Sequence, residues 1–193
     1  MHLQIVLGSI REGRRSGPIA QWAVERASSR ADVTVELVDL KAWNLPMFDL
    51  AKFPSEGHYE DPLQRRWAET VARADGYLFV VAEYNHGYTS ALKNALDYLY
   101  AEWNRKPASF IAFGNAEGAR AVQQLKLVLN ELEVAPLPTA VHLRGVAKKI
   151  VDGAFVAEPA EEKRFDTMFD EWMWWTRALR TARDQQGSPW PAP

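Results

Sequence analysis

The sequence predicts an α/β protein in which a five-stranded parallel sheet is covered by helices on both faces. Short apolar runs, which suit buried strands, alternate along the chain with segments whose apolar residues recur at helical spacing. Strands joined by helices form βαβ units, and their right-handed crossovers produce a parallel sheet. Because 193 residues suffice for one sizeable core, we expect a single domain over residues 1–185 and a loose tail over 186–193.

The first part of the chain is expected to supply two strands and a helix. Residues 3–7 form a continuous apolar run, which predicts a short buried strand. Residues 19–29 then carry apolar side chains at helical spacing, and residues 33–40 are rich in β-branched residues that alternate with polar ones. Residues 44–60 contain two prolines and a glycine, which favours a long loop.

The middle of the chain is expected to form a helix, a strand and a second helix. Asp61 followed by Pro62 is typical of an N-cap and of a proline at the first helical position, so a helix is predicted over 62–74. Residues 77–82 are continuously apolar, which indicates a strand buried on both faces. Residues 90–102 follow with an apolar stripe at helical spacing.

The last part of the chain completes the sheet. Residues 108–113 form another apolar strand, residues 118–132 form a helix with one apolar face, and a weaker strand is expected at about 139–143. A final helix is predicted over 160–183. Of the two common orders for such sheets, the dinucleotide-binding order and 2-1-3-4-5, five strands favour the second.

Composition excludes several classes of function. The formal net charge of −2 argues against a binder of nucleic acid or of anionic membranes, which usually carries a basic surplus. The absence of cysteine excludes disulfides, thiolate catalysis and cysteine-ligated metals, and the four histidines are too scattered to indicate a metal site. We see neither a signal peptide nor an apolar run approaching the roughly 20 residues of a membrane span, so a cytoplasmic protein is expected.

The first loop, Gly8–Pro18, follows the first strand and contains three arginines, two serines and three glycines. It opens a helix whose N-terminal N–H groups attract anions, and Ser9, Arg11 and Ser16 can add hydrogen bonds to a phosphate. It lacks both Gly-Lys-Ser/Thr and Gly-x-Gly-x-x-Gly, and Asp39 lies about 30 residues onward, beyond the roughly 20 typical of a ribose-binding acid. The alternative is a solvated, arginine-rich turn with Ser16 as the helix cap.

Two further loops follow the third and fourth strands. The second loop, Glu83–Ser90, offers Tyr84 and Tyr88 as faces for a flat ring, with polar groups for the edge of that ring. The third loop, Gly114–Arg120, is glycine-containing and polar. Taken alone, either loop could instead be an ordinary turn without a role in binding. In a 2-1-3-4-5 sheet, however, all three loops face one crevice at the switch point, which suits a phosphorylated aromatic mononucleotide.

At these residues the sequence resembles the NADPH-dependent FMN reductase family, whose fold is flavodoxin-like. The first loop is similar to the family's Gly-Ser-x-Arg-x-x-Ser phosphate loop, although Ser16 comes two residues later. Ala82-Glu83-Tyr84-Asn85 and Leu92-Lys93-Asn94-Ala95-Leu96-Asp97 resemble its Pro-Glu-Tyr-Asn loop and the helix that follows. Ala82 departs from the usual proline, which leaves the entry to the second loop less rigid. The resemblance, which extends to Gly118–Ala121, covers roughly residues 3–143.

The resemblance implies a bound FMN that takes hydride from NADPH or NADH and passes electrons to a small-molecule acceptor such as a quinone, free flavin, azo compound or oxidised metal ion. The chemistry belongs to the flavin, so no acid–base catalytic residue and no metal ligand is assigned. By analogy with the family, the phosphate is expected at Ser9, Arg11, Ser16 and the backbone around Gly17, Pro18 and Ile19. The isoalloxazine ring is expected at Glu83, Tyr84, Asn85, His86 and Gly87, with Gly114 and Asn115 nearby.

Other features leave alternatives open. Arg14 and Arg15 are either solvated charges or a positive field for the phosphate of NADPH. The tryptophan-rich final helix has more apolar surface than one face can bury, which predicts a homodimer or homotetramer that contacts there. Two other functions compete with this one: an electron carrier of the flavodoxin type, and a flavin-free interaction protein of the same fold. A carrier is usually strongly acidic, whereas this chain is nearly neutral.

Overall fold

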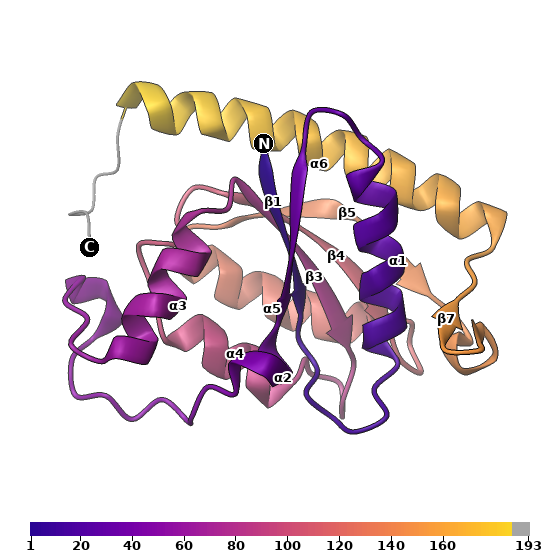
Figure 1. Cartoon of the computed structure of the whole chain (residues 1–193), viewed down its shortest axis with the longest axis horizontal. Helices are drawn as coiled ribbons and strands as arrows, with labels where there is room; N and C mark the ends of the chain where they lie inside the picture. Colours follow the sequence, from indigo (N-terminus) through magenta and orange to yellow (C-terminus); the bar gives the residue numbers. More distant parts are fainter. Residues whose placement is uncertain (187–193) are drawn as a thin grey trace.

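A computed structural model, which describes residues 1–186, contains one parallel five-stranded sheet in the order β2-β1-β3-β4-β5 (Figure 1). Its strands are β1 (His2–Leu7), β2 (Thr34–Asp39), β3 (Gly76–Ala82), β4 (Pro107–Phe113) and β5 (Ala135–Leu143). Every neighbouring pair in this sheet is parallel. The predicted fold class, number of strands and order 2-1-3-4-5 are therefore confirmed.

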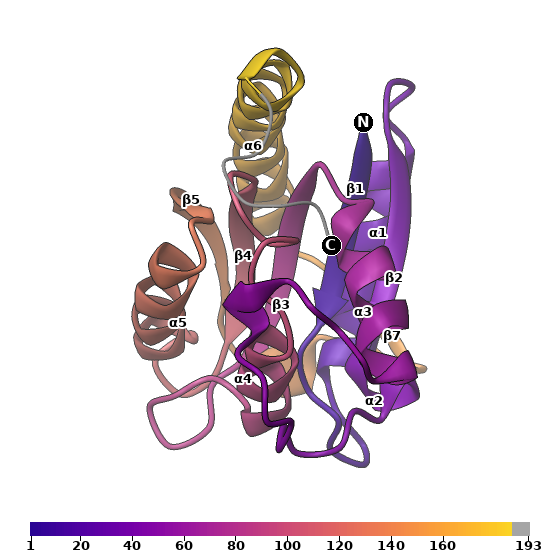
Figure 2. The same cartoon turned by 90° about the vertical axis from the view of Figure 1, so that its left-hand side faces the viewer.

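Two hydrophobic clusters lie on opposite faces of this sheet. Along β3, Tyr77 and Phe79 belong to one cluster, whereas Leu78 and Val80 belong to the other, as the alternation of strand side chains requires. Helices α3 (Pro62–Ala72), α4 (Ser90–Asp97) and α5 (Ala119–Glu131) cover the first face. Helices α1 (Ser16–Ser28) and α6 (Pro159–Gln186) cover the second face (Figures 1 and 2). The expected helical layers on both faces are thus present.

Several boundaries differ from the sequence-based expectation. The helix predicted over 90–102 ends at Asp97, and turns lead from there to β4. Strand β5 begins at Ala135 and accommodates two prolines, because it is an edge strand with no neighbour on one side. Short elements that carry too few residues for a periodic pattern were missed: α2 (Leu40–Trp43), the 3₁₀ turns η1 (Pro54–Glu56) and η2 (Val146–Lys148), and the hairpin of β6 (Ile150–Val151) and β7 (Ala154–Phe155).

The start of α3 follows its sequence pattern. The Asp61 carboxylate accepts a hydrogen bond from the backbone N–H of Gln64 at 2.7 Å, and Pro62 occupies the first helical position. The N-cap prediction is therefore confirmed. Proline is tolerated there because its missing N–H would have no partner inside the helix.

Helix α6 packs on β5 and β4 and reaches the amino end of β3 at Gly76. A Cβ atom on Gly76 would come within 2.8 Å of Trp172 Nε1 and 2.9 Å of Thr176 Oγ1, so the absence of a side chain allows this close approach. Figure 1 shows α6 lying across the end of the sheet at which the chain begins. Gln186, expected in the tail, is the last residue of this helix, and the rest of the expected tail, 187–193, lies outside the described residues.

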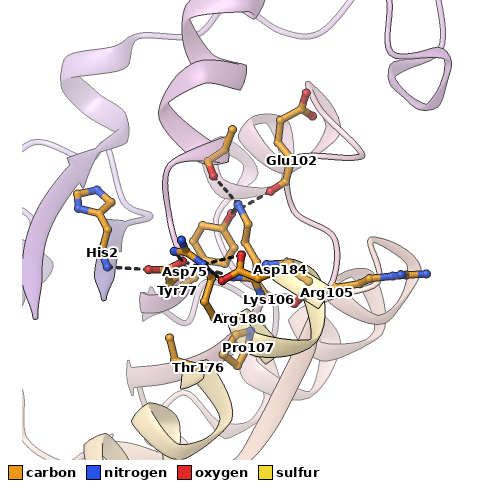
Figure 3. A network of polar contacts seen from close by, with 12 residues as sticks. His2, Asp75, Tyr77, Glu102, Arg105, Lys106, Pro107, Thr176, Arg180 and Asp184 are labelled. Carbon is orange, nitrogen blue, oxygen red and sulfur yellow. Dashed lines mark hydrogen bonds and ion pairs between the residues drawn. The ribbon is translucent and has the colours of Figure 1, made fainter. Parts of the chain in front are cut away.

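A buried carboxylate also anchors α6 at this end. Asp75, which precedes β3, accepts hydrogen bonds from the backbone N–H of His2 at 2.9 Å and from Arg180 at 2.6 Å. Figure 3 shows His2 and Arg180 beside Asp75. Arg183, one helical turn after Arg180, approaches the same carboxylate at 3.4 Å. Burial opposes ionisation of Asp75, but these donors outweigh it and hold its pKa below the usual value.

Within residues 1–186, no helix combines the length and apolar character that crossing a membrane requires.

Candidate active site

A cavity of about 910 Å³ opens at the carboxyl ends of β1, β3 and β4. All three polar loops contribute to it, as the strand order predicts for the switch point of the sheet. The predicted site residues that line it are Ser9, Arg11, Ser16, Glu83, Tyr84, Asn85, His86, Gly114 and Asn115. Its wall further contains residues absent from the predicted set, namely Glu12, Gly13, Arg14, Arg15, Ala82, Phe113 and Arg120.

The first loop presents a helix N-terminus to the cavity. Helix α1 begins at Ser16, and no side chain among residues 1–186 caps it; the preceding residue, Arg15, has helical backbone angles. The Ser16 side chain is fully buried, and its Oγ has no hydrogen-bond partner among the described residues. The alternative in which Ser16 caps the helix is therefore not what the structure contains. A buried hydroxyl without a partner, beside uncapped N–H groups, fits an anion such as a phosphate.

Three predicted residues of the first turn of α1 do not line the cavity with their side chains. Ile19 is fully buried in the hydrophobic cluster shared with α6. Gly17 and Pro18 are half-buried, and a Cβ on Gly17 would meet no other atom within 4 Å. These residues can contribute only backbone to a ligand in this cavity.

Two arginines of the first loop are free to interact with a ligand. Arg11 and Arg15 are exposed, line the cavity and form no hydrogen bond or ion pair through their side chains within residues 1–186. Ser9, by contrast, is buried, and its Oγ lies 2.7 Å from the hydroxyl of Tyr84. This contact joins the first loop to the second.

A tight turn shapes the second loop. The backbones of Tyr84 and Gly87 exchange two hydrogen bonds, of 2.8 and 2.9 Å. Between them, Asn85 and His86 have φ angles of 48° and 72°, the positive pair that a type I′ turn requires. The turn leaves Asn85 and His86 exposed at the rim of the cavity. Gly87 closes the turn without lining the cavity, and Tyr88 packs against the hydrophobic core instead of facing the site.

Arg120, at the start of α5, joins the second loop to the third. Its Nε donates to Glu83 Oε1 at 2.7 Å, its Nη2 donates to the same oxygen, and its Nη1 lies 2.8 Å from His86 Nε2. Because arginine only donates, His86 Nε2 must accept, which places the ring proton of neutral His86 on Nδ1. Burial opposes ionisation of Glu83, but the hydrogen bonds and charge of Arg120 outweigh it and lower its pKa. The other Glu83 oxygen, Oε2, is buried without a partner among the described residues.

Gly114 makes this arrangement possible at the end of β4. A Cβ there would lie 2.7 Å from Glu83 Cβ, so any larger residue would displace the Glu83 side chain. The resemblance already included Arg120 in its third matching stretch, but the sequence offered no sign that this side chain reaches Glu83 across the sheet.

Comparisons with known proteins agree with this geometry. The model of the NADPH-dependent FMN reductase family matches residues 1–148. An NAD(P)H-dependent FMN reductase of Schizosaccharomyces pombe is 38% identical over 160 residues, which cover 82% of this chain and 79% of the relative. A quinone reductase of Pseudomonas putida is 29% identical over 188 residues, covering 91% of this chain and 96% of the relative.

The fold is shared with a solved structure as well. The flavoenzyme FerB, an NAD(P)H:(acceptor) oxidoreductase of Paracoccus denitrificans, superimposes with a TM-score of 0.69 at 19% identity, covering 92% of this chain and 98% of FerB. At this identity the likeness concerns the fold. The extent of the family match and the identity to the yeast relative settle the family: the chain belongs to the NADPH-dependent FMN reductases.

Proposed function

We propose that this cavity binds FMN and that the protein reduces a small-molecule acceptor with electrons from NADPH or NADH. The observation that carries the proposal is the Ser16 hydroxyl, which is fully buried at the uncapped N-terminus of α1 and has no partner in the part of the chain that the structure describes. A phosphate would satisfy this hydroxyl and the neighbouring N–H groups together. When bound, FMN supplies the hydride-accepting ring; the protein supplies binding and orientation.

The phosphate end of FMN is assigned to the first loop. Ser16, the backbone around Gly17, Pro18 and Ile19, and the side chain of Arg11 would surround it, and Ser9 lies close by. Arg11 suits this role because its guanidinium is exposed at the cavity and forms no other ion pair within residues 1–186.

The ring is assigned to the second and third loops. Tyr84 offers an aromatic face that is 38% exposed, and the turn at Asn85 and His86 offers polar groups at its rim. Gly114 and Asn115 would complete this part of the site with backbone and a small side chain, and Gly87 would hold the turn that carries Asn85 and His86. The pair of Glu83 and Arg120 holds two of these loops together, which favours a pre-formed site.

The acceptor is assigned to the class of quinones and similar small oxidants, which include free flavin, azo compounds and oxidised metal ions. Relatives named as quinone reductases support this class. The cavity, at about 910 Å³, lies in the upper range for small-molecule sites. NADPH as the preferred donor rests on the name of the family.

The test is an absorbance spectrum of the purified protein, followed by anaerobic titration with NADPH and NADH. We expect a flavin band that either nucleotide bleaches and that a quinone restores. A protein that stays colourless after incubation with FMN would contradict the proposal and support a flavin-free interaction protein. Bleaching without turnover of any acceptor would favour an electron carrier.

We also propose a homodimer or homotetramer that contacts through α6. Trp174 and Trp175 pack edge to face with ring centroids 5.3 Å apart, yet remain 63% and 36% exposed. Covering these rings would remove apolar surface from water. Sedimentation of the wild type should give an oligomer, and Trp174→Ser should weaken it. A monomer at micromolar concentration would overturn this assignment.

The single domain over residues 1–185 and the cytoplasmic location remain proposals from the sequence.

A further inference from the structure

Arg14 lies at the centre of a small network that ties the first loop to the neighbouring strand. Its Nη1 donates to the backbone oxygen of Ser9 at 2.7 Å and to Asp39 Oδ1 at 2.7 Å, and its Nη2 donates to Asp39 Oδ2 at 2.5 Å. One guanidinium therefore closes the loop on itself and also fastens it to the end of β2. The side chain of its neighbour Arg15 forms no such contacts within residues 1–186, so the two adjacent arginines differ in role.

The local backbone places these groups for each other. Gly13 has a φ of 62° with no atom near its missing Cβ, so it turns the chain and directs Arg14 back toward Ser9. Asp39 is the last residue of β2 and the N-cap of α2, where it accepts from the backbone N–H of Lys41 at 2.9 Å. The next residue, Leu40, is buried in the hydrophobic core, which anchors the chain directly after Asp39.

We propose that Arg14 and Asp39 form a clasp that holds the first loop in its phosphate-binding shape. Both are then positioning residues for FMN and not ligands of it. The inference rests on the proposed function, because it concerns the same FMN site. It also assigns Asp39 a task other than binding a ribose: its two carboxylate oxygens are both occupied by Arg14.

Geometry and burial make this pair stronger than a surface ion pair. The contact is bidentate, and the two side chains are 17% and 27% exposed, so solvent screens their attraction less than that of exposed charges. The second tether of the loop, Lys41 to Glu12 at 2.6 Å, is much more exposed, at 45% and 93%. A loop that is already ordered loses less conformational entropy when it binds a phosphate, which raises affinity.

The test compares FMN with riboflavin, which has the same ring but no phosphate. Dissociation constants are measured by flavin fluorescence for the wild type, Arg14→Gln, Asp39→Asn and the double variant. Each single variant should bind FMN about tenfold more weakly, and the double variant should be no worse than either, because the two residues act as one unit. Riboflavin affinity should stay within about twofold in all variants, since the clasp acts on the phosphate loop.

The variants are chosen to separate positioning from folding and from direct binding. Asparagine remains a good N-cap, so Asp39→Asn keeps α2 while it removes the charge of the clasp. Asp166→Asn is the matched control: it breaks an Arg–Asp pair of 2.7 Å with Arg26, between α1 and α6, and should leave both flavin affinities unchanged. Thermal unfolding of each flavin-free variant reports on folding, and Arg14→Lys should restore FMN affinity only in part.

Several results would overturn the clasp. If Arg14→Gln weakens FMN binding far more than Asp39→Asn, or if Asp39→Asn tightens it, Arg14 is a direct phosphate ligand. If the wild type binds FMN and both variants bind it equally well, the clasp has no positioning role while the proposed function stands. If riboflavin affinity falls in parallel with FMN affinity, the variants disturb the whole site. A wild type that binds neither flavin refutes the proposed function and the clasp with it.

Discussion

The two ends of the sheet differ in how their buried polar groups are satisfied. At the carboxyl ends, Ser16 Oγ and Glu83 Oε2 are buried at the cavity without partners within residues 1–186. At the amino ends, Asp75 and Lys106 each meet three partners from the chain itself (Figure 3). Glu102 Oε1 and Asn104 Oδ1, in the segment before β4, are also buried without a partner within residues 1–186, but neither residue lines the cavity.

This difference separates binding from stability. Unpartnered buried groups cost stability in the free protein and are satisfied when a ligand arrives. Groups that already have partners within the chain stabilise the fold and have nothing left to offer a ligand. We therefore expect substitutions at the cavity to alter flavin affinity with little effect on unfolding, and substitutions at the amino ends to do the reverse.

The largest effect is expected for Asp75→Asn. The substitution keeps an acceptor for the backbone N–H of His2 but removes the charge that faces Arg180 and Arg183. Because Arg183 is only 18% exposed, it is left without a charged partner in a mostly buried place, which should cost about 3 kcal/mol of unfolding free energy. Urea unfolding measures this loss. A loss below about 1 kcal/mol, or a weaker FMN affinity in the folded variant, would contradict the assignment of stability to the amino ends of the sheet and binding to the carboxyl ends.

The opposite behaviour is expected for Arg11→Ala. A charge-assisted hydrogen bond to the FMN phosphate contributes about 1.5–3 kcal/mol, so FMN affinity should fall roughly 10- to 100-fold. The unfolding free energy of the flavin-free protein should change by less than about 0.5 kcal/mol, because Arg11 is exposed and has no ion pair within residues 1–186. Flavin fluorescence and urea titration measure the two quantities.

Arg15→Ala is the matched control for Arg11→Ala. Arg15 is also exposed at the cavity and also lacks an ion pair within the described part of the chain. If both variants lose FMN affinity equally, a general positive field would explain the effect and Arg11 would not be a specific ligand.

A pH dependence is expected from Lys106. Burial lowers its pKa from 10.5 to about 7, so between these values the unfolded chain binds a proton that the folded chain does not. Stability should therefore rise with pH above 7, by about 1 kcal/mol per unit from this residue. Urea unfolding at pH 7, 8 and 9 should show the rise in the wild type and a smaller rise in Lys106→Met. Identical slopes would mean that Lys106 keeps its proton in the fold.

The smallest effect is expected for Asp61→Ala at the start of α3. At the other end of this helix, the backbone oxygens of Val71 and Ala72 accept hydrogen bonds from Lys106. Side chains therefore satisfy backbone groups at both ends of α3. Loss of the N-cap should cost about 1 kcal/mol of unfolding free energy. FMN affinity should not change, since Asp61 does not line the cavity. Asp61→Asn, which retains a capping acceptor, should recover most of the loss.

The sequence anticipated the fold because its signals are local and repeated. Continuous apolar runs at β3 and β4 indicate strands buried on both faces, and the intervening helical patterns require parallel crossovers. Helix ends were less predictable. Helix α4 ends at Asp97, before its apolar pattern does, and the backbone oxygen of Leu96 accepts from Trp103 Nε1 in the turns that follow. Such a stop depends on packing between residues that the local pattern does not relate.

The strand order and the three loops that share one edge of the sheet could be predicted from the residues alone, because apolar periodicity and loop chemistry are properties of short segments. The pairing of single side chains depends on the folded chain: Arg14 faces Asp39 whereas Arg15 has no ion pair within residues 1–186, and Arg120 pairs with Glu83 across two loops. Among the described residues, folding also leaves Ser16 Oγ without a partner and gives the Asp75 carboxylate three. These outcomes depend on distances between segments 25 to 108 residues apart, which periodicity does not encode.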